Sequence, residues 1–201
     1  MVIVSAEQVS PDCVKITTSA GPSFFIRLSY LLLVPVQAVC SGAQFSGDEE
    51  TDIIDAGIVF GAEKKAVDYL ARAEQCRFGL TAKLTAKGFD KKSISRALDY
   101  LEQKEYLSDA RFARAWLNNR KISKSEGRIR LAAELASRGI CKETAASALD
   151  EFFENTSEED LCRRAFEKCH RLGKDREKTQ SYLQRCGFSF KLIETVLNWN
   201  N

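Results

Sequence analysis

A glycine that recurs at nearly constant spacing is the feature that most restricts the fold of this chain. Three segments each contain a Leu, three further residues, a Gly and then an apolar residue. The three Gly positions are 51 and then 48 residues apart. The segments are Leu84-Gly88-Phe89, Leu135-Gly139-Ile140 and Leu183-Gly187-Phe188. Self-similarity at such a period predicts a tandem repeat architecture.

Each repeat has the pattern of three short helices. Gly at a helix end adopts the left-handed conformation at low cost, and the apolar residue after it turns back to pack. In the first repeat the next helix has apolar residues at i, i+3, i+4 and i+7, a buried face: Ile94, Ala97, Leu98 and Leu101. A further helix precedes each Gly-ended one, at about 63–75, 109–121 and 158–172. We therefore expect an all-α fold: three tandem three-helix repeats forming an elongated body, with a small β-rich N-terminal segment.

The composition of the chain changes near residue 62. The segments Cys13–Thr18 and Ser23–Leu28 flank a turn-like stretch and predict a β-hairpin. The polar, acidic stretch Ser41–Asp55 is interpreted as a loop leading into a helix. No Pro occurs from residue 63 onward, and the period becomes helical. The predicted domains are an N-terminal extension at 1–62 and helical repeats at 63–106, 107–156 and 157–201.

The cysteines and the longest apolar run bear on the cellular compartment. Seven Cys without a C-x-x-C pair favour reduced thiols in a reducing cytosol. A metal site at Cys162, Cys169 and His170 is disfavoured, because the last two point to different sides of a helix. The run 28–39 is broken by Pro35 and is too short to span a bilayer as a helix. We expect a cytoplasmic protein with no metal and no membrane span.

Motifs for catalysis are missing from the sequence. It contains no phosphate-binding loop, no dinucleotide-binding glycine motif and no nucleophile elbow. The acidic run 158–160 contains residue types that serve as metal ligands in a nuclease, but acids at a helix start more often interact with the helix dipole. The prediction is a non-enzymatic protein without catalytic residues or a cofactor.

Charged residues are unevenly distributed along the chain, and basic side chains form two stripes. Residues 1–62 carry two basic and seven acidic side chains, whereas residues 63–201 carry 28 basic and 21 acidic. One stripe lies in the second repeat and is interpreted as partner-binding. Helical spacing places Arg111, Arg114 and Lys121 on one helix face, and Lys124 and Arg128 follow on the next helix. The other stripe, in the third repeat, suits phosphate contact with some base stacking on single-stranded DNA: Lys174, Lys178, Tyr182 and Arg185. The alternative for both is an ordinary solvated helix face.

The segment 105–113, EYLSDARFA, resembles the signature of the RecX family, which typically has Gly-Tyr-Leu-(Asp/Asn)-Asp-x-Arg-Phe-Ala. Here Glu105 replaces the usual Gly and Ser108 the usual acidic or amide residue. The matching residues are Tyr106, Leu107, Asp109, Arg111, Phe112 and Ala113. The Gly-containing segments also fit the family's repeats, so that the resemblance covers about residues 63–201.

The resemblance implies a regulator of the RecA recombinase. Proteins of this family consist of tandem three-helix repeats, bind RecA filaments on single-stranded DNA, and restrain RecA's ATPase, strand exchange and coprotease activity. We expect a monomer that binds the RecA filament, and single-stranded DNA weakly or indirectly. Two alternatives remain: a helical-repeat protein that binds nucleic acid directly, and a scaffold for another protein partner.

The signature residues also have a simple structural interpretation. Tyr106, Leu107, Phe112 and Ala113 are expected in the core between the first two repeats, from the burial preferences of their types. Asp109 is expected at a helix start, where it would accept hydrogen bonds from free backbone N–H groups. Arg111 suits either an internal acid or an acidic partner.

Overall fold

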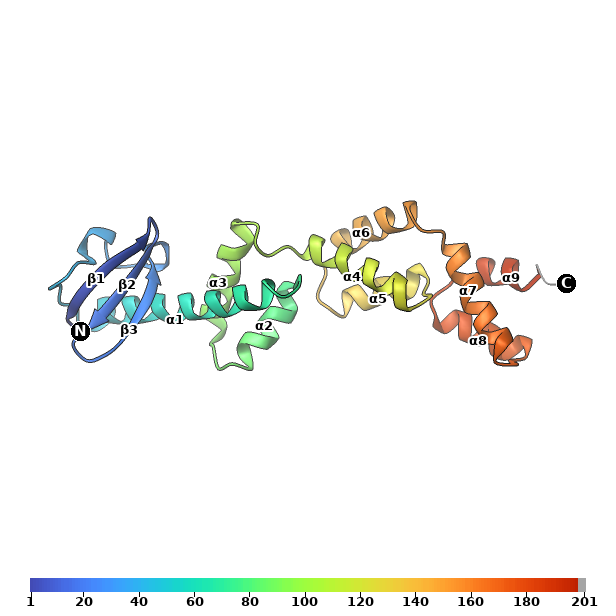
Figure 1. The fold of residues 1–201 in the computed structure, drawn as a ribbon, viewed down its shortest axis with the longest axis horizontal. Coiled ribbons are helices and arrows are strands. Elements are labelled where there is room, and N and C mark those ends of the chain that lie inside the picture. The colour runs from blue at the N-terminus through green and yellow to red at the C-terminus, as the bar shows by residue number, and fades with distance from the viewer. Residues whose placement is uncertain (199–201) are drawn as a thin grey trace. The chain divides into compact units, whose positions relative to one another are not determined.

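The computed structural model describes residues 1–198 and divides into two compact units (Figure 1). The N-terminal unit consists of Met1–Ala73 and Gly79–Leu107. The C-terminal unit combines Glu74–Phe78 with the chain from Ser108 on. The described residues form three strands and nine α-helices. The expected fold class, mainly helical with a small β-rich N-terminal segment, is therefore confirmed.

The N-terminal segment is a three-stranded antiparallel sheet in the order β1-β2-β3. The predicted hairpin is confirmed: β2, Cys13–Thr18, pairs with β3, Gly21–Arg27. A third strand, β1, Ile3–Ser10, pairs with β2 and was not expected. The face of the sheet that carries Ile16 and Ile26 is buried against the first helix, α1, so that the segment has a core of its own.

Helix α1 spans Gly47–Leu70, which corrects two expectations. The acidic stretch predicted as a loop is helical from residue 47 on, and the helix predicted at 63–75 starts earlier and ends at Leu70. Three acidic side chains occupy its first turn, where their negative charge interacts favourably with the positive end of the helix dipole and stabilises the helix start. Ile53, Ala56 and Val59 are fully buried in the core that the helix shares with the sheet. The helix therefore begins well before residue 62 and continues across the boundary proposed there between the N-terminal extension and the first repeat. The four-part division of the chain stays a prediction.

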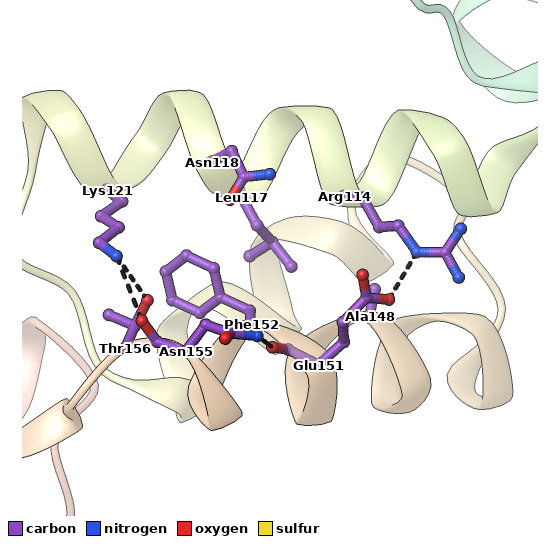
Figure 2. A pocket seen from close by; sticks show the side chains of 9 residues that line it. All are labelled: Arg114, Leu117, Asn118, Lys121, Ala148, Glu151, Phe152, Asn155 and Thr156. Atoms are coloured by element: carbon purple, nitrogen blue, oxygen red, sulfur yellow. Dashed lines mark hydrogen bonds and ion pairs between the residues drawn. The ribbon is translucent and has the colours of Figure 1, made fainter.

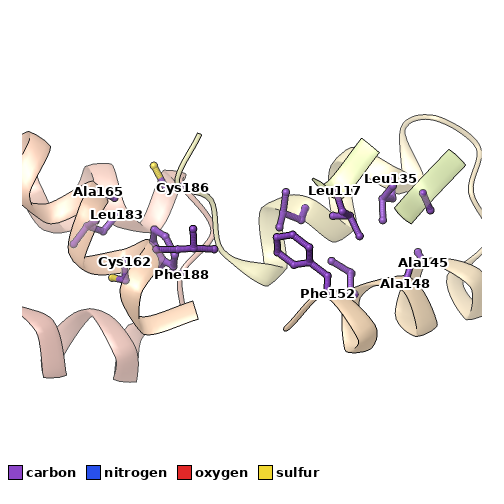
Figure 3. Packing of buried hydrophobic residues seen from close by; sticks show 14 of the residues in the cluster. Leu117, Leu135, Ala145, Ala148, Phe152, Cys162, Ala165, Leu183, Cys186 and Phe188 are labelled. Atoms are coloured by element: carbon purple, nitrogen blue, oxygen red, sulfur yellow. The ribbon is translucent and has the colours of Figure 1, made fainter. Parts of the chain in front are cut away.

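The remaining helices follow the repeat order predicted from the glycines. They are α2 Arg77–Thr85, α3 Lys91–Gln103, α4 Asp109–Ser123, α5 Arg128–Ala136, α6 Lys142–Glu154, α7 Glu158–Arg171, α8 Arg176–Arg185 and α9 Phe190–Asn198. The apolar face predicted for α3 is buried, and α6 and α9 each bury a face of the same kind. In the C-terminal unit, Leu117, Leu135 and Phe152 pack between α4, α5 and α6, and Leu183 and Phe188 pack with α7 (Figure 3). These side chains belong to one apolar cluster that spans both repeats.

The repeated glycines end α2, α5 and α8 in the same way. Gly88, Gly139 and Gly187 have φ angles of 87°, 75° and 85°, in the left-handed region. In each turn the residue after the Gly donates a backbone hydrogen bond to the carbonyl of the Leu four residues before the Gly. The three turns differ in what surrounds them. A Cβ at Gly88 would meet nothing within 4 Å, whereas one at Gly187 would overlap the backbone of Arg130.

The turn before α4 corrects the expected burial of Tyr106. Its neighbour Glu105 is the one non-glycine residue with a positive φ, 59°, among the described residues. The chain reverses there, and Leu107 enters the core while the side chain of Tyr106 stays 62% exposed. Of the other signature residues, Ala113 is fully buried and Phe112 is partly buried.

Carboxylates from one helix cap the start of another in the C-terminal unit. Ser108 caps its own helix α4 by accepting from Arg111 N–H. Asp109 instead accepts from Arg77 N–H at the first residue of α2, over 2.8 Å. Glu158, the first residue of α7, accepts from Arg128 N–H at the first residue of α5, also over 2.8 Å. Asp109 therefore binds free backbone N–H groups as expected, but those of a different helix.

We predict that Gly187→Ala destabilises the protein more than Gly88→Ala. Both substitutions force alanine into the left-handed region, which costs about 1–2 kcal/mol. At Gly187 the new methyl group also overlaps a backbone, adding about 1–3 kcal/mol of overpacking. Urea unfolding of both variants measures the difference, and equal losses would contradict a close backbone approach at residue 187.

We predict that Glu105→Gly stabilises the protein by about 0.5–1 kcal/mol, because glycine removes the left-handed strain. Glu105→Gln keeps that strain and serves as the control, with no gain in the free energy of unfolding. A glycine variant that is no more stable than the glutamine variant would show that the turn at residue 105 is not strained.

Candidate functional site: a basic cleft in the C-terminal unit

A cleft of about 420 Å³ lies within the C-terminal unit. Its lining comes from the end of α4 and the loop after it, from the first turn of α5, from α7, and from the end of α8. The lining residues are Lys121, Ile122, Ser123, Lys124, Ser125, Glu126, Arg130, Arg164, Ala165, Lys168, Tyr182 and Cys186. Five cations and one carboxylate line the cleft, so that it suits an anionic ligand.

The one carboxylate in the lining is neutralised within the protein. Glu126 is buried and accepts a hydrogen bond from Arg120 Nε over 2.6 Å. Arg130 Nε lies 2.9 Å from the other carboxylate oxygen. The hydrogen bond with Glu126 raises the pKa of the Arg120 guanidinium, which also lies over the ring of Trp116. Glu126 therefore organises two arginines and leaves the surface of the cleft positive.

Three of the lining cations face the cleft without an internal counter-charge. Lys124, Arg164 and Lys168 are exposed and form no ion pair with the residues at positions 1–198. Arg164 and Lys168 lie one turn apart on the same face of α7. Like charges gathered on one wall gain free energy when an anion binds between them.

Several residues of the basic stripe predicted in the second repeat bind partners within the C-terminal unit. Arg111 Nε donates to Glu74 over 2.8 Å, and Arg114 Nε donates to Glu151 over 2.7 Å. Lys121 donates to the hydroxyl of Thr156 over 2.8 Å, and it also lines the basic cleft. Figure 2 shows Arg114 and Lys121 reaching from α4 towards α6 and the residues after it.

The last two residues of the second-repeat stripe, Lys124 and Arg128, differ in whether they have an internal partner. Arg128 pairs with Asp150 on α6, whereas Lys124 lies in the cleft. Partly exposed pairs of this kind contribute about 0–1 kcal/mol each. An external carboxylate or phosphate can therefore replace the internal partner of such an arginine.

In the basic stripe of the third repeat, too, one residue lines the cleft and others lie outside it. Tyr182 lines the cleft, and Lys174 Nζ lies 4.4 Å from the centre of its ring. Burial, followed by the neighbouring Cys186 thiol, raises the pKa of the Tyr182 hydroxyl, which keeps it a hydrogen-bond donor at neutral pH. Lys178 pairs with Asp175 over 2.7 Å, and Arg185 is exposed. Tyr182 is the member of this stripe that the structure places in the cleft lining.

The cleft thus combines members of both predicted stripes with residues that the sequence analysis missed. Lys121 and Lys124 come from the first stripe and Tyr182 from the second. Arg130, Arg164 and Lys168 were not predicted. The spacing of Arg164 and Lys168, i and i+4 on one helix, was the signal in the sequence that pointed to them.

Neither metal-binding clusters nor membrane-spanning helices occur in the described part of the chain. Within residues 1–198, no group of three or more His, Cys, Asp or Glu side chains is placed to hold a metal ion. In the same range, no helix is both long and apolar enough to cross a bilayer. The cysteines are free thiols. Burial raises the pKa of Cys162 to about 12, so that this thiol is not a thiolate at neutral pH.

The fold and the cleft define a tandem helical-repeat protein with a cationic cleft. A family model described as RecX, second three-helix domain, matches residues 108–149. The regulatory protein RecX of Treponema pallidum (strain Nichols) is 40% identical over 138 residues, which cover 69% of this chain and 84% of that protein. The regulatory protein RecX of Clostridioides difficile (strain 630) is 25% identical over 98% of this chain and 94% of that protein.

Solved structures agree with these comparisons. A crystal structure of regulatory protein RecX superposes with a TM-score of 0.77 at 19% identity, covering 98% of both chains. The crystal structure of RecX from Lactobacillus salivarius gives a TM-score of 0.61 at 20% identity, covering 70% of this chain and 95% of that one. The chain belongs to the RecX family of regulatory proteins.

We predict that Glu126→Gln lowers the free energy of unfolding by about 2 kcal/mol, because it removes the charge that holds Arg120 by hydrogen bonds and Arg130 by an ion pair. The control is Glu134→Gln, whose carboxylate is more exposed and pairs with Arg138, with a loss of about 0.5–1 kcal/mol. Thermal melts of both variants measure the losses. An equal or smaller loss at residue 126 would contradict its organising role.

Proposed function

We propose that this chain is a non-enzymatic regulator that binds RecA filaments on single-stranded DNA. Its main effect is inhibition of the RecA ATPase, strand exchange and coprotease activity, in recombination, DNA repair and the SOS response. The proposal combines the membership of the RecX family with the cationic cleft of the C-terminal unit. We also propose that it acts in the cytoplasm as a monomer and needs no metal or cofactor.

The basic cleft is the observation that carries the proposal. A filament on single-stranded DNA presents phosphates and the carboxylates of its protein, and either anion suits the cleft. Lys124, Arg164 and Lys168 have no counter-charge within residues 1–198, so that an anion binds there without breaking an internal pair. We assign Lys121, Lys124 and Tyr182 to this contact, together with the three cations found in the structure.

The other residues of the two stripes have a secondary role in the proposal. Arg111, Arg114 and Arg128 are partner-binding residues that exchange their internal carboxylates for those of the filament. Lys174, Lys178 and Arg185 remain proposed DNA contacts around Tyr182. Exchange of this kind is possible because partly exposed ion pairs are weak.

The RecA ATPase assay on single-stranded DNA tests the proposed function. We expect the wild-type chain to lower the ATPase rate at or below stoichiometric amounts. Arg164→Ala with Lys168→Ala removes two unpaired cations and is expected to weaken inhibition about tenfold or more. Lys142→Ala with Lys191→Ala is the matched control, because both lysines are exposed in the same unit but do not line the cleft.

Each outcome of this assay has a definite meaning. An unchanged ATPase rate with the wild-type chain would overturn the proposed function. Inhibition that the control pair and the cleft pair reduce equally would overturn the assignment of the cleft. Circular dichroism of both variants confirms that the helices remain intact.

A second candidate function is direct binding of nucleic acid through the same cleft, favoured by its cations and its tyrosine. Binding of bare single-stranded DNA would then weaken steeply with salt. Each lost phosphate contact would reduce the slope of log affinity against log salt by about 0.7. Tight binding of bare DNA without an effect on RecA would favour this second function.

A further inference from the structure

An exposed apolar loop in the N-terminal unit is held in place by a buried anchor and by hydrogen bonds to its backbone. The loop lies between β3 and α1, and its side chains Leu32, Leu33 and Val36 are 65%, 61% and 46% exposed. The neighbouring Val34 is buried in the core of the N-terminal unit and anchors the loop. We call Leu32, Leu33 and Val36 the apolar knob. Exposed apolar side chains that lie together often mark a protein contact.

A buried carboxylate fixes the backbone of this loop. Asp52, on α1, accepts hydrogen bonds from the N–H groups of Leu32, Leu33 and Val34 over 2.8–3.0 Å. Burial opposes the charge on Asp52, yet the three donors together lower the pKa of its carboxyl. Arg96 also binds the carbonyl of Tyr30 at the start of the loop. The backbone of the knob is thus organised before any partner arrives, which reduces the entropy lost on binding.

The acidic first turn of α1 lies one helical turn before Asp52, the residue that binds the backbone of the loop. Asp48 and Glu49 project within about 60° of Asp52 around the helix axis, at 100° per residue. Both are exposed and form no ion pair with residues of the described range 1–198, whereas Glu50 pairs with the N-terminal amine and Asp55 with Lys92. The first 62 residues carry seven acidic and two basic side chains. The exposed, unpaired charges on the first turn of α1 are therefore acidic, whereas the one cation described at the loop, Arg96, is engaged with the Tyr30 carbonyl.

We propose that the apolar knob and its acidic border form a protein-docking surface for an apolar recess edged by lysines or arginines. This inference rests on the proposed function and places that recess on the protein of the filament. An apolar contact with an acidic border excludes DNA as the ligand, because Asp48 and Glu49 repel phosphates. Complementary charge selects a basic recess, and burial of the two leucines provides most of the affinity.

Binding of the full-length protein to preformed RecA filaments tests the inference. The probes are filaments assembled on oligo(dT) with a slowly hydrolysed ATP analogue, and the same oligo(dT) without RecA. Leu32→Ser with Leu33→Ser is expected to weaken filament binding by about tenfold or more. The same pair should leave binding to bare oligo(dT) unchanged.

The matched control is Val9→Ser with Val67→Ser, which alters two exposed apolar side chains of the same unit. Val67 lies fifteen residues beyond Asp52 on α1, or about 22 Å along the helix axis. Filament binding of this control is expected to stay within about twofold of the wild type. A second variant, Asp48→Asn with Glu49→Gln, should weaken binding about threefold and reduce its sensitivity to salt.

The outcomes separate the inference from the proposed function. A wild-type chain that does not bind the filament overturns both. Normal filament binding by the leucine variant, or the same loss in the valine control, overturns the docking surface alone. Loss of binding to bare oligo(dT) by the leucine variant also overturns it, because the knob would then belong to a DNA contact.

Discussion

The close approach of the turns at Gly127 and Gly187 sets the geometry on which the basic cleft depends. Gly127 N–H donates to the carbonyl of Cys186 over 2.8 Å, and a Cβ on either glycine would overlap the opposite backbone. Because Gly187 ends the turn after α8 and Gly127 precedes α5, this contact seats the end of α8 beside the loop that follows α4. Tyr182 and Cys186 thereby become a wall of the cleft. The glycine that defines the sequence period is thus also the residue that brings two repeats within reach of one ligand.

Carboxylates in the C-terminal unit are used largely inside the fold, which determines where positive charge remains. Asp109 and Glu158 each cap the first turn of a helix that precedes their own in the chain, while Asp175 caps its own helix α8 by accepting from Lys178 N–H. Glu126 and Glu134 pair with arginines along α4 and α5. A carboxylate that already binds a helix end or a buried arginine does not neutralise the positive charge of a lysine elsewhere. Among the residues that line the cleft, Lys124, Arg164 and Lys168 are left without an internal counter-charge within positions 1–198.

Local signals in the sequence predicted local structure, and tertiary contacts decided the rest. The caps at Ser108 and at the repeated glycines depend on the nearest residues, so the helix ends there were predictable. The start of α1 was not, because the polar stretch after Ser41 becomes helical only when Ile53 and Val59 enter a core with the sheet. The exposure of Tyr106 follows from a left-handed turn that glutamate rarely adopts. The cleft draws on three separate segments of the chain, and helical spacing within one segment identifies only the residues that this segment contributes.

The two units carry surfaces of different chemistry, one basic and one apolar with acidic neighbours, and under the proposed function a protein filament on DNA presents a counterpart for each. The cleft attracts anions through Lys124, Arg164 and Lys168, and salt weakens an attraction of this kind. The knob at Leu32 and Leu33 gains affinity from apolar burial, which moderate salt leaves intact. Under the proposed function, a chain that had only the cleft would bind any polyanion. A chain that had only the knob would bind the filament protein whether or not DNA is present. Under the same proposal, joining both surfaces in one polypeptide multiplies their affinities when both engage the filament, which would favour a DNA-bound protein filament over either component alone.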